Sequence, residues 1–293
     1  MSSDFNTAVH GKWILAGEHA VIRGHSALVF PITSKSLTLS YQNSSKELSA
    51  SYSGESGADT HLLFWSVLEQ GMQLQTRSLN QLSGHFDLYS DVPIGVGMGA
   101  SAALCVATAR WFATQITEKS LDIHEFAKRL EDLFHGQSSG LDIAGVAATS
   151  GVHFLQGRCT PLTIAWTPQW FLSSCGQIGI TSHCIDLVKA LWEKDPTFAT
   201  SIDQHMSYCV QKAQNALEKQ TATSLPELAD AINSAKDCFQ QWGLVSDGLQ
   251  KHMDSLREAG AIAVKPTGSG GGGYVISLWA TKPPEMDIEL MAI

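Results

Sequence analysis

Residues 91–103 read DVPIGVGMGASAA, and their three alternate glycines constrain the fold more than any other feature of the chain. They follow an alternating, strand-like segment at 85–89 and open a run of Ala, Leu and Cys residues that favours a helix. Glycine lets a backbone approach a ligand closely, and the first turn of a helix offers N–H groups to an anion. The order of strand, glycine turn and helix therefore predicts a phosphate-binding loop, while tight packing of a helix on a sheet is the alternative.

Two other glycine-rich nucleotide loops are compared with this pattern. The P-loop requires GxxxxGK[ST], but the only Gly-Lys pair, Gly11-Lys12, is followed by Trp13. The dinucleotide fingerprint also needs a second strand that ends in an acid about 20 residues further on, and here Asp122 begins a predicted helix. A P-loop enzyme is therefore excluded by the pattern, and an NAD-binding oxidoreductase stays a weaker alternative.

A second glycine-rich segment, KPTGSGGGGY at 265–274, lies between predicted strands at 261–264 and 274–279. A flexible linker is one interpretation of it. A turn between two strands is the other, and Lys265, Thr267 and Ser269 then supply polar groups that could face an anion. One glycine loop in each half of the chain suggests a ligand at a domain junction.

Composition limits the class of protein. The 293 residues suffice for two domains, and the net charge of −9 is opposite to the basic field that attracts nucleic acid or an anionic membrane, so we expect neither partner. Six cysteines without a CxxC pair predict reduced, mostly buried thiols. Because the start lacks a basic, apolar signal and no stretch reaches the roughly 20 apolar residues of a membrane span, we expect a cytoplasmic protein.

Hydrophobic periodicity predicts an α+β chain. Helices are expected at 61–74 and 123–133, the second capped by Asp122, and long helical patterns fill 184–259. Further strands are expected at 27–40 (broken at Pro31), 152–155, 162–165 and 177–181. Pro168 suits a connection, so the predicted domains are 1–168 and 169–293.

Four blocks resemble motifs of the GHMP small-molecule kinases. Residues 11–21 match Gly-Lys-(apolar)-Ile-Leu-x-Gly-Glu-His-Ala-Val, and 93–103 are similar to Pro-x-Gly-x-Gly-x-Gly-Ser-Ser-Ala-Ala. Residues 131–142 resemble the segment with a Glu before His-Gly-x-x-Ser-Gly-x-Asp, and 265–273 resemble Lys-x-Thr-Gly-(small)-Gly-Gly-Gly-Gly. The blocks keep the family's order across nearly the whole chain, and the first is most similar to the branch that phosphorylates mevalonate.

The resemblance implies a two-domain GHMP kinase fold, with an N-terminal domain like ribosomal protein S5 domain 2, a ferredoxin-like C-terminal domain and the active site between them. It implies an ATP- and Mg²⁺-dependent enzyme that phosphorylates the primary hydroxyl of mevalonate, giving 5-phosphomevalonate and ADP in isoprenoid precursor biosynthesis. The resemblance is also compatible with a homodimer. The alternatives are a GHMP kinase with a phosphomevalonate, homoserine or sugar acceptor, and a non-catalytic nucleotide-binding relative.

The resemblance also assigns roles to residues. Asp142 matches the catalytic acid that orients or deprotonates the hydroxyl, and Lys12 matches the lysine that stabilises the transferring phosphoryl group. Ser101 and Glu131 match the Mg²⁺ ligands. The positions that match the ATP-binding loop are Pro93, Gly95, Val96, Gly97, Met98, Gly99, Ala100, Ser101 and Ala102. The positions that match the substrate-binding set are Lys12, Glu18, His19, Asp142, Gly268, Ser269 and Gly270.

The chain departs from the family pattern at a few positions. His10 stands where the family usually has Pro, Ala100-Ser101 replaces Ser-Ser, and Leu104 replaces a frequent Tyr. The basic, Thr-containing segment that often follows the first strand of the C-terminal half is not found around 181–189. The motifs therefore define the phosphoryl donor better than the acceptor.

Overall fold

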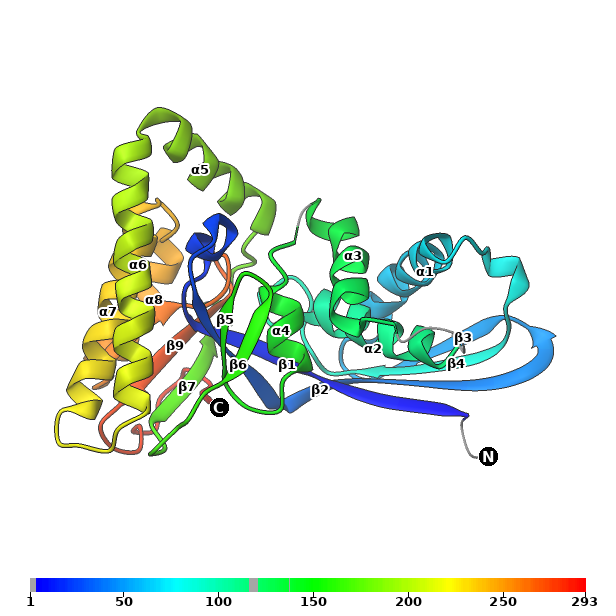
Figure 1. Cartoon of the computed structure of the whole chain (residues 1–293). Helices are drawn as coiled ribbons and strands as arrows, with labels where there is room; N and C mark the ends of the chain where they lie inside the picture. Colours follow the sequence, from blue (N-terminus) through cyan, green and yellow to red (C-terminus); the bar gives the residue numbers. More distant parts are fainter. Residues whose placement is uncertain (1–3, 116–120, 137) are drawn as a thin grey trace. The chain divides into compact units, whose positions relative to one another are not determined.

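The computed structural model describes residues 4–115, 121–136 and 138–293 and divides into two compact units (Figure 1). Unit 1 comprises Met1–Lys12, Pro31–Ile94 and Met98–Thr149, and unit 2 comprises Trp13–Phe30, Gly95–Gly97 and Ser150–Ile293. Two long strands, β1 (Phe5–Ala16) and β2 (Ala27–Glu47), contribute residues to both units. The predicted domain boundary after residue 168 stays a prediction.

Unit 1 contains strands covered by helices on one face (Figure 1). β2 pairs antiparallel with β4 (Ser83–Ser90), and β4 pairs parallel with β3 (Ser49–Ser53). Helix α1 (Gly57–Leu74) and the short 3₁₀ helix η2 (Leu79–Gln81) make the crossover that parallel strands require. In β4 the burial alternates residue by residue, so the strand predicted at 85–89 is confirmed.

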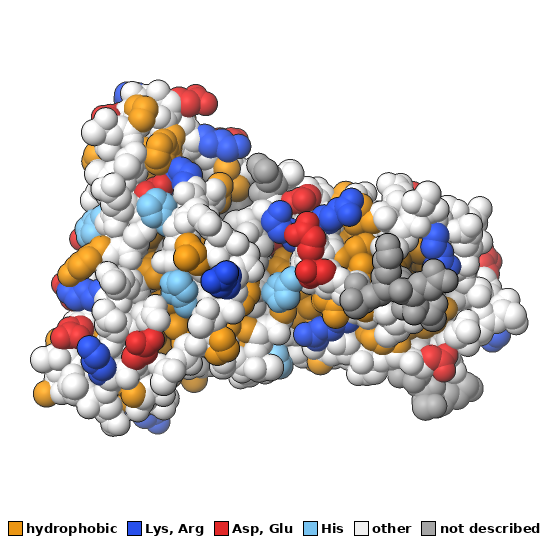
Figure 2. Space-filling view, viewed as in Figure 1, with side chains coloured by type: hydrophobic (Ala, Val, Ile, Leu, Met, Phe, Trp, Pro, Cys, Tyr) orange, Lys and Arg blue, Asp and Glu red, His pale blue; other side chains and the backbone are white. Residues whose placement is uncertain are grey.

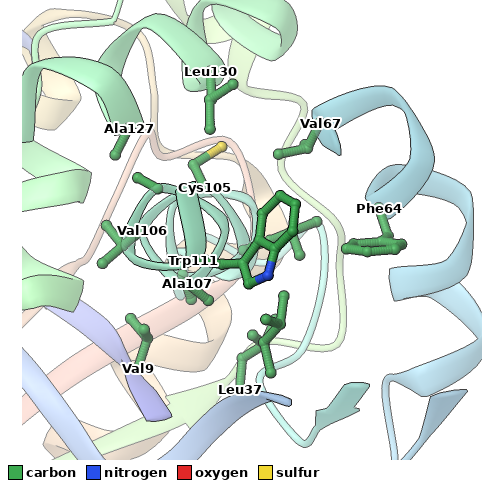
Figure 3. Close-up of a cluster of buried hydrophobic side chains, with 14 of the residues drawn as sticks. Val9, Leu37, Phe64, Val67, Cys105, Val106, Ala107, Trp111, Ala127 and Leu130 are labelled. Carbon is green, nitrogen blue, oxygen red and sulfur yellow. The ribbon is translucent and has the colours of Figure 1, made fainter. Parts of the chain in front are cut away.

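The core of unit 1 forms around Trp111, which is fully buried on α2 (Ala100–Thr114). Figure 3 shows the indole directed between Val67 and Phe64 of α1, with Leu37 of β2 below it. The rings of Phe86 and Trp111 meet edge to face with centroids 5.0 Å apart, an arrangement that adds to simple burial. This cluster fixes α2, and therefore its N-cap Gly99, against the sheet.

Two further helices complete unit 1. Helix α3 (Ile123–His135) begins where the sequence predicts, because the Asp122 carboxylate accepts a hydrogen bond of 3.0 Å from the N–H of Glu125. Its apolar stripe packs on α2. The seven-residue helix α4 (Leu141–Ala147) follows a left-handed Gly140 and contacts both α2 and α3.

Unit 2 contains a hairpin and an antiparallel sheet. β5 (Val152–Leu155) pairs with β6 (Arg158–Pro161) and with the first residues of β2. The separate sheet has the order β10-β7-β9-β8, and its strands are β7 (Gln169–Ser174), β8 (Ala263–Pro266), β9 (Tyr274–Trp279) and β10 (Met291–Ala292). The glycine-rich segment 267–273 is the connection between β8 and β9, so it is a turn between strands and the linker alternative is wrong.

Four helices accompany this sheet: α5 (Thr181–Lys194), α6 (Pro196–Leu217), α7 (Ser224–Gln241) and α8 (Asp247–Glu258). α6 and α7 pack along each other, while α7 and α8 lie against β8. Side-chain caps begin α6 and α8. The Asp195 carboxylate accepts a hydrogen bond from the N–H of Phe198, and the Ser246 hydroxyl accepts one from the N–H of Leu249. The helical pattern predicted across 184–259 is confirmed, and it corresponds to these four helices.

One strand prediction is wrong in part, and two are wrong. β2 continues through Pro31, because its pairing with β5 ends at Val29 and its pairing with β4 begins at Leu37, and a residue without an N–H is tolerated between them. Residues 162–165 follow β6 instead of forming a strand, and β7 begins at 169, where the sequence suggested a connection. The segment 177–181 is a loop, for a reason that the candidate site provides.

The α+β class is confirmed by this mixture of helices and mainly antiparallel strands. Within the part of the chain that the structure describes, no helix is both long and apolar enough to cross a bilayer. On the face shown in Figure 2, acidic and basic side chains are interspersed among polar and apolar ones. Four of the six cysteines, Cys105, Cys184, Cys209 and Cys238, are buried.

Candidate active site

Lys12 and Asp142 form an ion pair in unit 1. The Lys12 ammonium lies 2.8 Å from a carboxylate oxygen of Asp142, and the two side chains are 2% and 34% exposed. Lys12 comes from the middle of β1, whereas Asp142 comes from the first turn of α4, 130 positions later in the sequence. The structure therefore brings together the two residues predicted for the reacting centre, with the amine covered and the carboxylate partly open to a substrate.

The first glycine loop meets the Gly-Lys motif at this pair. The N–H of Lys12 donates to the carbonyl of Met98 at 2.9 Å, and Gly99 lies under the Lys12 side chain. Gly99 has φ +80°, and a Cβ there would lie 2.8 Å from Cγ of Lys12 and 3.0 Å from Val146. The glycine is required both for its left-handed backbone and for the space that the lysine occupies.

We expect Gly99→Ala to reduce turnover in the predicted phosphoryl transfer by at least about tenfold, because a displaced group of the predicted reacting centre loses much of its orientation advantage. The new methyl group would lie 2.8 Å from Cγ of Lys12, so the lysine side chain or the loop must shift. Gly157→Ala is the matched control, because Gly157 also has a positive φ (+81°) but nothing lies within 4 Å of a Cβ placed there. Equal losses of activity in the two folded variants, measured by steady-state kinetics, would contradict this role of Gly99.

The N-terminus of α2 carries the predicted phosphate-binding backbone. Gly99 is its N-cap, and no described side chain caps the helix there. The N–H groups of Ala100, Ser101 and Ala102 belong to the first turn, where a helix has no partner of its own for them and favours an anion. Ser101 is half-buried in this turn. Gly95–Gly97, the other part of the loop, belongs to unit 2.

Glu131 on α3 is a buried carboxyl group with unusual properties. One oxygen accepts a hydrogen bond from the Ser138 hydroxyl, while Oε1 has no hydrogen-bond partner among the described residues. Burial, followed by the negative charge of Asp142, raises the pKa of Glu131 to about 8. Such an orphaned oxygen, close to the carboxylates of Asp142 and Asp132, fits a cation that would replace the proton. Gln137, which is part of the same motif, lies outside the described residues.

In unit 2, Glu18 forms a buried ion pair with Lys265. The Lys265 ammonium donates to a Glu18 carboxylate oxygen and, at 3.3 Å, to the carbonyl of Ile14. Both side chains are almost completely covered, at 2% and 0% exposure. Burial lowers the pKa of Lys265, and the Glu18 carboxylate opposes that shift. The first and last motif blocks are thus joined by a salt bridge, so Glu18 holds Lys265 in addition to any role toward a substrate.

His19 holds the second glycine loop. Its Nε2–H donates to the carbonyl of Ser269 at 2.8 Å, which fixes the tautomer because a carbonyl can only accept. The ring is buried edge-on against Trp242. Burial lowers the pKa of His19 to about 4, so the imidazole is neutral at physiological pH. The predicted residues His19 and Ser269 are therefore in direct contact.

The two glycine-rich loops lie against each other in unit 2. A Cβ on Gly97 would lie 3.6 Å from the carbonyl oxygen of Thr267, and one on Gly273 would lie 2.9 Å from that of Val96. The segment predicted as a strand at 177–181 packs on the same loops, since a Cβ on Gly179 would lie 2.6 Å from the Gly270 carbonyl oxygen. Its backbone is used in loop packing, which is why it does not extend a sheet.

Sequence reasoning missed two contributors to this site, Thr181 and Cys184, while a third, Thr267, was among the polar groups it named. Thr181 Oγ1 lies 3.2 Å from the Ser269 hydroxyl, although no motif was found around it. Cys184 donates its thiol to the Gly270 carbonyl at 3.3 Å, one helical turn later. Thr267 donates to the Ile14 carbonyl and accepts from the Ile14 N–H, both at 2.9 Å. Only Thr267 gave a signal, as a polar residue inside the tail glycine motif.

Comparison with known proteins agrees with this set of motifs. Residues 63–151 match the family model of the GHMP kinases N terminal domain. A mevalonate kinase from Pyrococcus horikoshii is 26% identical over 296 residues, covering 91% of this chain and 86% of the relative. One from Archaeoglobus fulgidus is 27% identical over 278 residues, covering 94% and 92%.

Solved structures show the same fold. A mevalonate kinase from L. major, solved with R-mevalonate, superposes with a TM-score of 0.77 at 20% identity and covers 96% of this chain and 88% of its own. A phosphomevalonate kinase from Streptococcus pneumoniae superposes with a TM-score of 0.72 at 14% identity, and the match covers 100% of both chains. The fold is therefore shared by kinases with different acceptors, and the GHMP kinase fold predicted from the motifs is confirmed. This chain therefore has the GHMP kinase fold, and its residues 63–151 match the model of that family's N-terminal domain.

Proposed function

We propose that this chain phosphorylates the primary hydroxyl of mevalonate with ATP, giving 5-phosphomevalonate and ADP for isoprenoid precursor synthesis. The observation that carries the proposal is the ion pair of 2.8 Å between Lys12 and Asp142, placed at the first glycine loop. Relatives named mevalonate kinase cover more than nine-tenths of the chain, which supports mevalonate over other acceptors. A cytoplasmic location and a homodimer stay predictions.

In the proposed mechanism Asp142 is the group that receives the acceptor. Its partly exposed carboxylate accepts a hydrogen bond from the primary hydroxyl, orients the oxygen for in-line attack and takes up the proton as the O–P bond forms. The buried Lys12 ammonium holds the Asp142 carboxylate in place through their ion pair. It also offers positive charge to the transferring phosphoryl group.

The first glycine loop and the start of α2 would bind the nucleotide phosphates through backbone N–H groups. Ser101 and Glu131 provide a hydroxyl and a carboxylate, two hard oxygen donors suited to Mg²⁺. When bound, Mg²⁺ neutralises phosphate charge. With a net charge of −9, the chain needs such local devices to hold ATP and an anionic acceptor together.

Initial rates of ADP release, measured across a panel of acceptors, test the proposal. We expect kcat/KM for mevalonate to exceed that for phosphomevalonate, homoserine or galactose by at least about a hundredfold, because differential binding in a polar site reaches such ratios. A clear preference for another acceptor would replace mevalonate by that acceptor. ATP binding without turnover of any acceptor would favour the non-catalytic alternative.

A further inference from the structure

A second buried ion pair in unit 2 lies outside the groups used above. Arg23, the last residue of the 3₁₀ helix η1 (His19–Arg23), donates from Nε to one carboxylate oxygen of Asp203 and from a terminal nitrogen to the other at 2.7 Å. Asp203 lies on α6 and is only 1% exposed, whereas Arg23 is 23% exposed. This two-pronged geometry is the one that fixes a guanidinium group most strictly.

Two other contacts hold the same turn. The Arg23 guanidinium carbon lies 5.0 Å from the ring centroid of Trp192 on α5, within the range of a cation–π interaction. The Ser207 hydroxyl on α6 lies 2.6 Å from Nδ1 of His25, two residues beyond η1. The C-terminal end of η1 is therefore held by both α5 and α6.

Stability alone does not explain a carboxylate at this position of α6. The preceding residue Ile202 and the residue one turn later, Met206, are both fully buried, so Asp203 lies on an apolar face. Removing an ion pair from water costs about as much as the pair regains, and apolar residues of similar volume often do as well. What the pair provides is geometry, because two hydrogen bonds allow one orientation of the turn.

The other end of η1 is His19, whose Nε2–H binds the Ser269 carbonyl at 2.8 Å. The Ser269 hydroxyl is in turn 3.2 Å from Thr181, the first residue of α5. Since α5 also carries Trp192, a closed ring of contacts runs from Arg23 through η1 to Ser269 and back through α5 to Arg23, and Asp203 holds this ring at Arg23. A displacement of Arg23 is thereby transmitted to the second glycine loop.

We propose that Asp203 is a positioning residue, which acts through Arg23 to hold η1, and hence His19, in the orientation that sets the Ser269 loop for the acceptor. This inference rests on the proposed function in one respect, the assignment of Ser269 to acceptor binding. The placement of η1 itself can be measured without turnover.

The kinetic test compares Asp203→Asn with Asp230→Asn. Asp230 is the control because it too forms an ion pair in unit 2, with Lys212 of α6, but its side chain is 59% exposed. We expect Asp203→Asn to raise KM for mevalonate by about tenfold or more and to leave KM for ATP within about twofold, since only the acceptor loop is misplaced. Arg23→Lys keeps the positive charge but loses the paired hydrogen bonds of the guanidinium group, so it should give a smaller rise in KM for mevalonate.

Imidazole ¹⁵N NMR gives the second readout. Arg23 and Asp203 are the charged groups that act on His19, and the Asp203 charge raises the His19 pKa. Loss of that charge alone would therefore lower the pKa further, whereas displacement of η1 exposes the ring and should raise the pKa toward its usual 6.5. We expect the rise in Asp203→Asn, a smaller rise in Arg23→Lys and no change in Asp230→Asn.

The two readouts separate the two proposals. Wild-type protein that turns over no mevalonate would refute the proposed function, and the His19 resonance would still decide the placement of η1. A folded Asp203→Asn with unchanged acceptor KM and a lowered or unchanged His19 pKa would overturn the positioning role. If Asp203→Asn does not fold, KM for mevalonate and the His19 pKa are measured in Arg23→Lys instead, and the same results support or overturn the positioning role.

Discussion

Asp142→Asn should lower kcat by at least about a hundredfold while the dissociation constant for ATP changes by less than about threefold. The amide keeps the size of the carboxylate but can neither accept the proton of the acceptor hydroxyl nor balance the Lys12 ammonium 2.8 Å away. Because Lys12 is buried, loss of its carboxylate partner also removes the contact that holds its ammonium in place. Rapid-quench kinetics and calorimetric ATP titration measure the two quantities separately.

Asp132→Asn is the matched control for this experiment. Asp132 is also a carboxylate of unit 1, and its Oδ1 accepts a hydrogen bond of 2.7 Å from the N–H of Ser138, which the amide oxygen of Asn can still accept. We expect kcat within about threefold of wild type. Full turnover in Asp142→Asn would remove this residue from the chemistry, and equal losses in both variants would indicate a general effect of charge.

Glu131→Gln should have opposite effects on activity and stability. We expect the Mg²⁺ concentration that gives half-maximal activity to rise by at least about tenfold, because an amide is a poorer ligand than a carboxylate for a hard cation. Without Mg²⁺, the same variant should be more stable than wild type at alkaline pH. The Gln carbonyl can still accept from Ser138, and no ionisable group then has to be buried.

The pH dependence follows from the raised pKa of Glu131. Its ordinary pKa is 4.5 and its pKa in the folded protein is about 8, so between these pH values the native state keeps a proton that the unfolded chain releases. The free energy of unfolding therefore falls as pH rises through this window, by about 1.4 kcal/mol for each pH unit. Below the window both states are protonated, and the penalty is absent.

Thermal unfolding in EDTA should thus show little difference between wild type and Glu131→Gln at a pH of about 4.5, where the unfolded chain has released only about half of the proton. At a pH of about 8.5 the variant should melt at least about 4 °C higher. Glu125→Gln serves as the control, since Glu125 is an exposed residue of the same helix. A Tm difference that does not grow with pH would contradict the raised pKa, and an unchanged Mg²⁺ requirement would exclude Glu131 as a ligand.

The amino-acid sequence predicted those helices and strands that are determined by residues close together in the chain. The start of α3 was predictable because the Asp122 cap acts within three residues, and β5 and β9 have the bounds expected from their apolar runs. Motif resemblance predicted that Lys12 and Asp142 meet, although 130 positions separate them. It could do so because both residues belong to recognisable blocks.

Other features depend on distant partners and gave no local signal. The segment 177–181 alternates like a strand, yet Ile178 and Ile180 are 72% and 64% exposed because the backbone packs on a glycine loop about 90 residues away. The Arg23–Asp203 pair joins residues 180 positions apart that belong to no common motif. The raised pKa of Glu131 depends on burial, which composition and spacing do not reveal.

A single-turnover reaction analysed by ³¹P NMR decides whether the chain transfers a phosphoryl group to mevalonate with Asp142 at the reacting centre. With enzyme in excess over ATP and with R-mevalonate and Mg²⁺ present, we expect one equivalent each of ADP and of a phosphate monoester on the primary carbon of mevalonate, and almost none of either with Asp142→Asn. ATP that stays intact, or phosphoryl groups that go to water or to another position of the acceptor, would refute the proposed reaction.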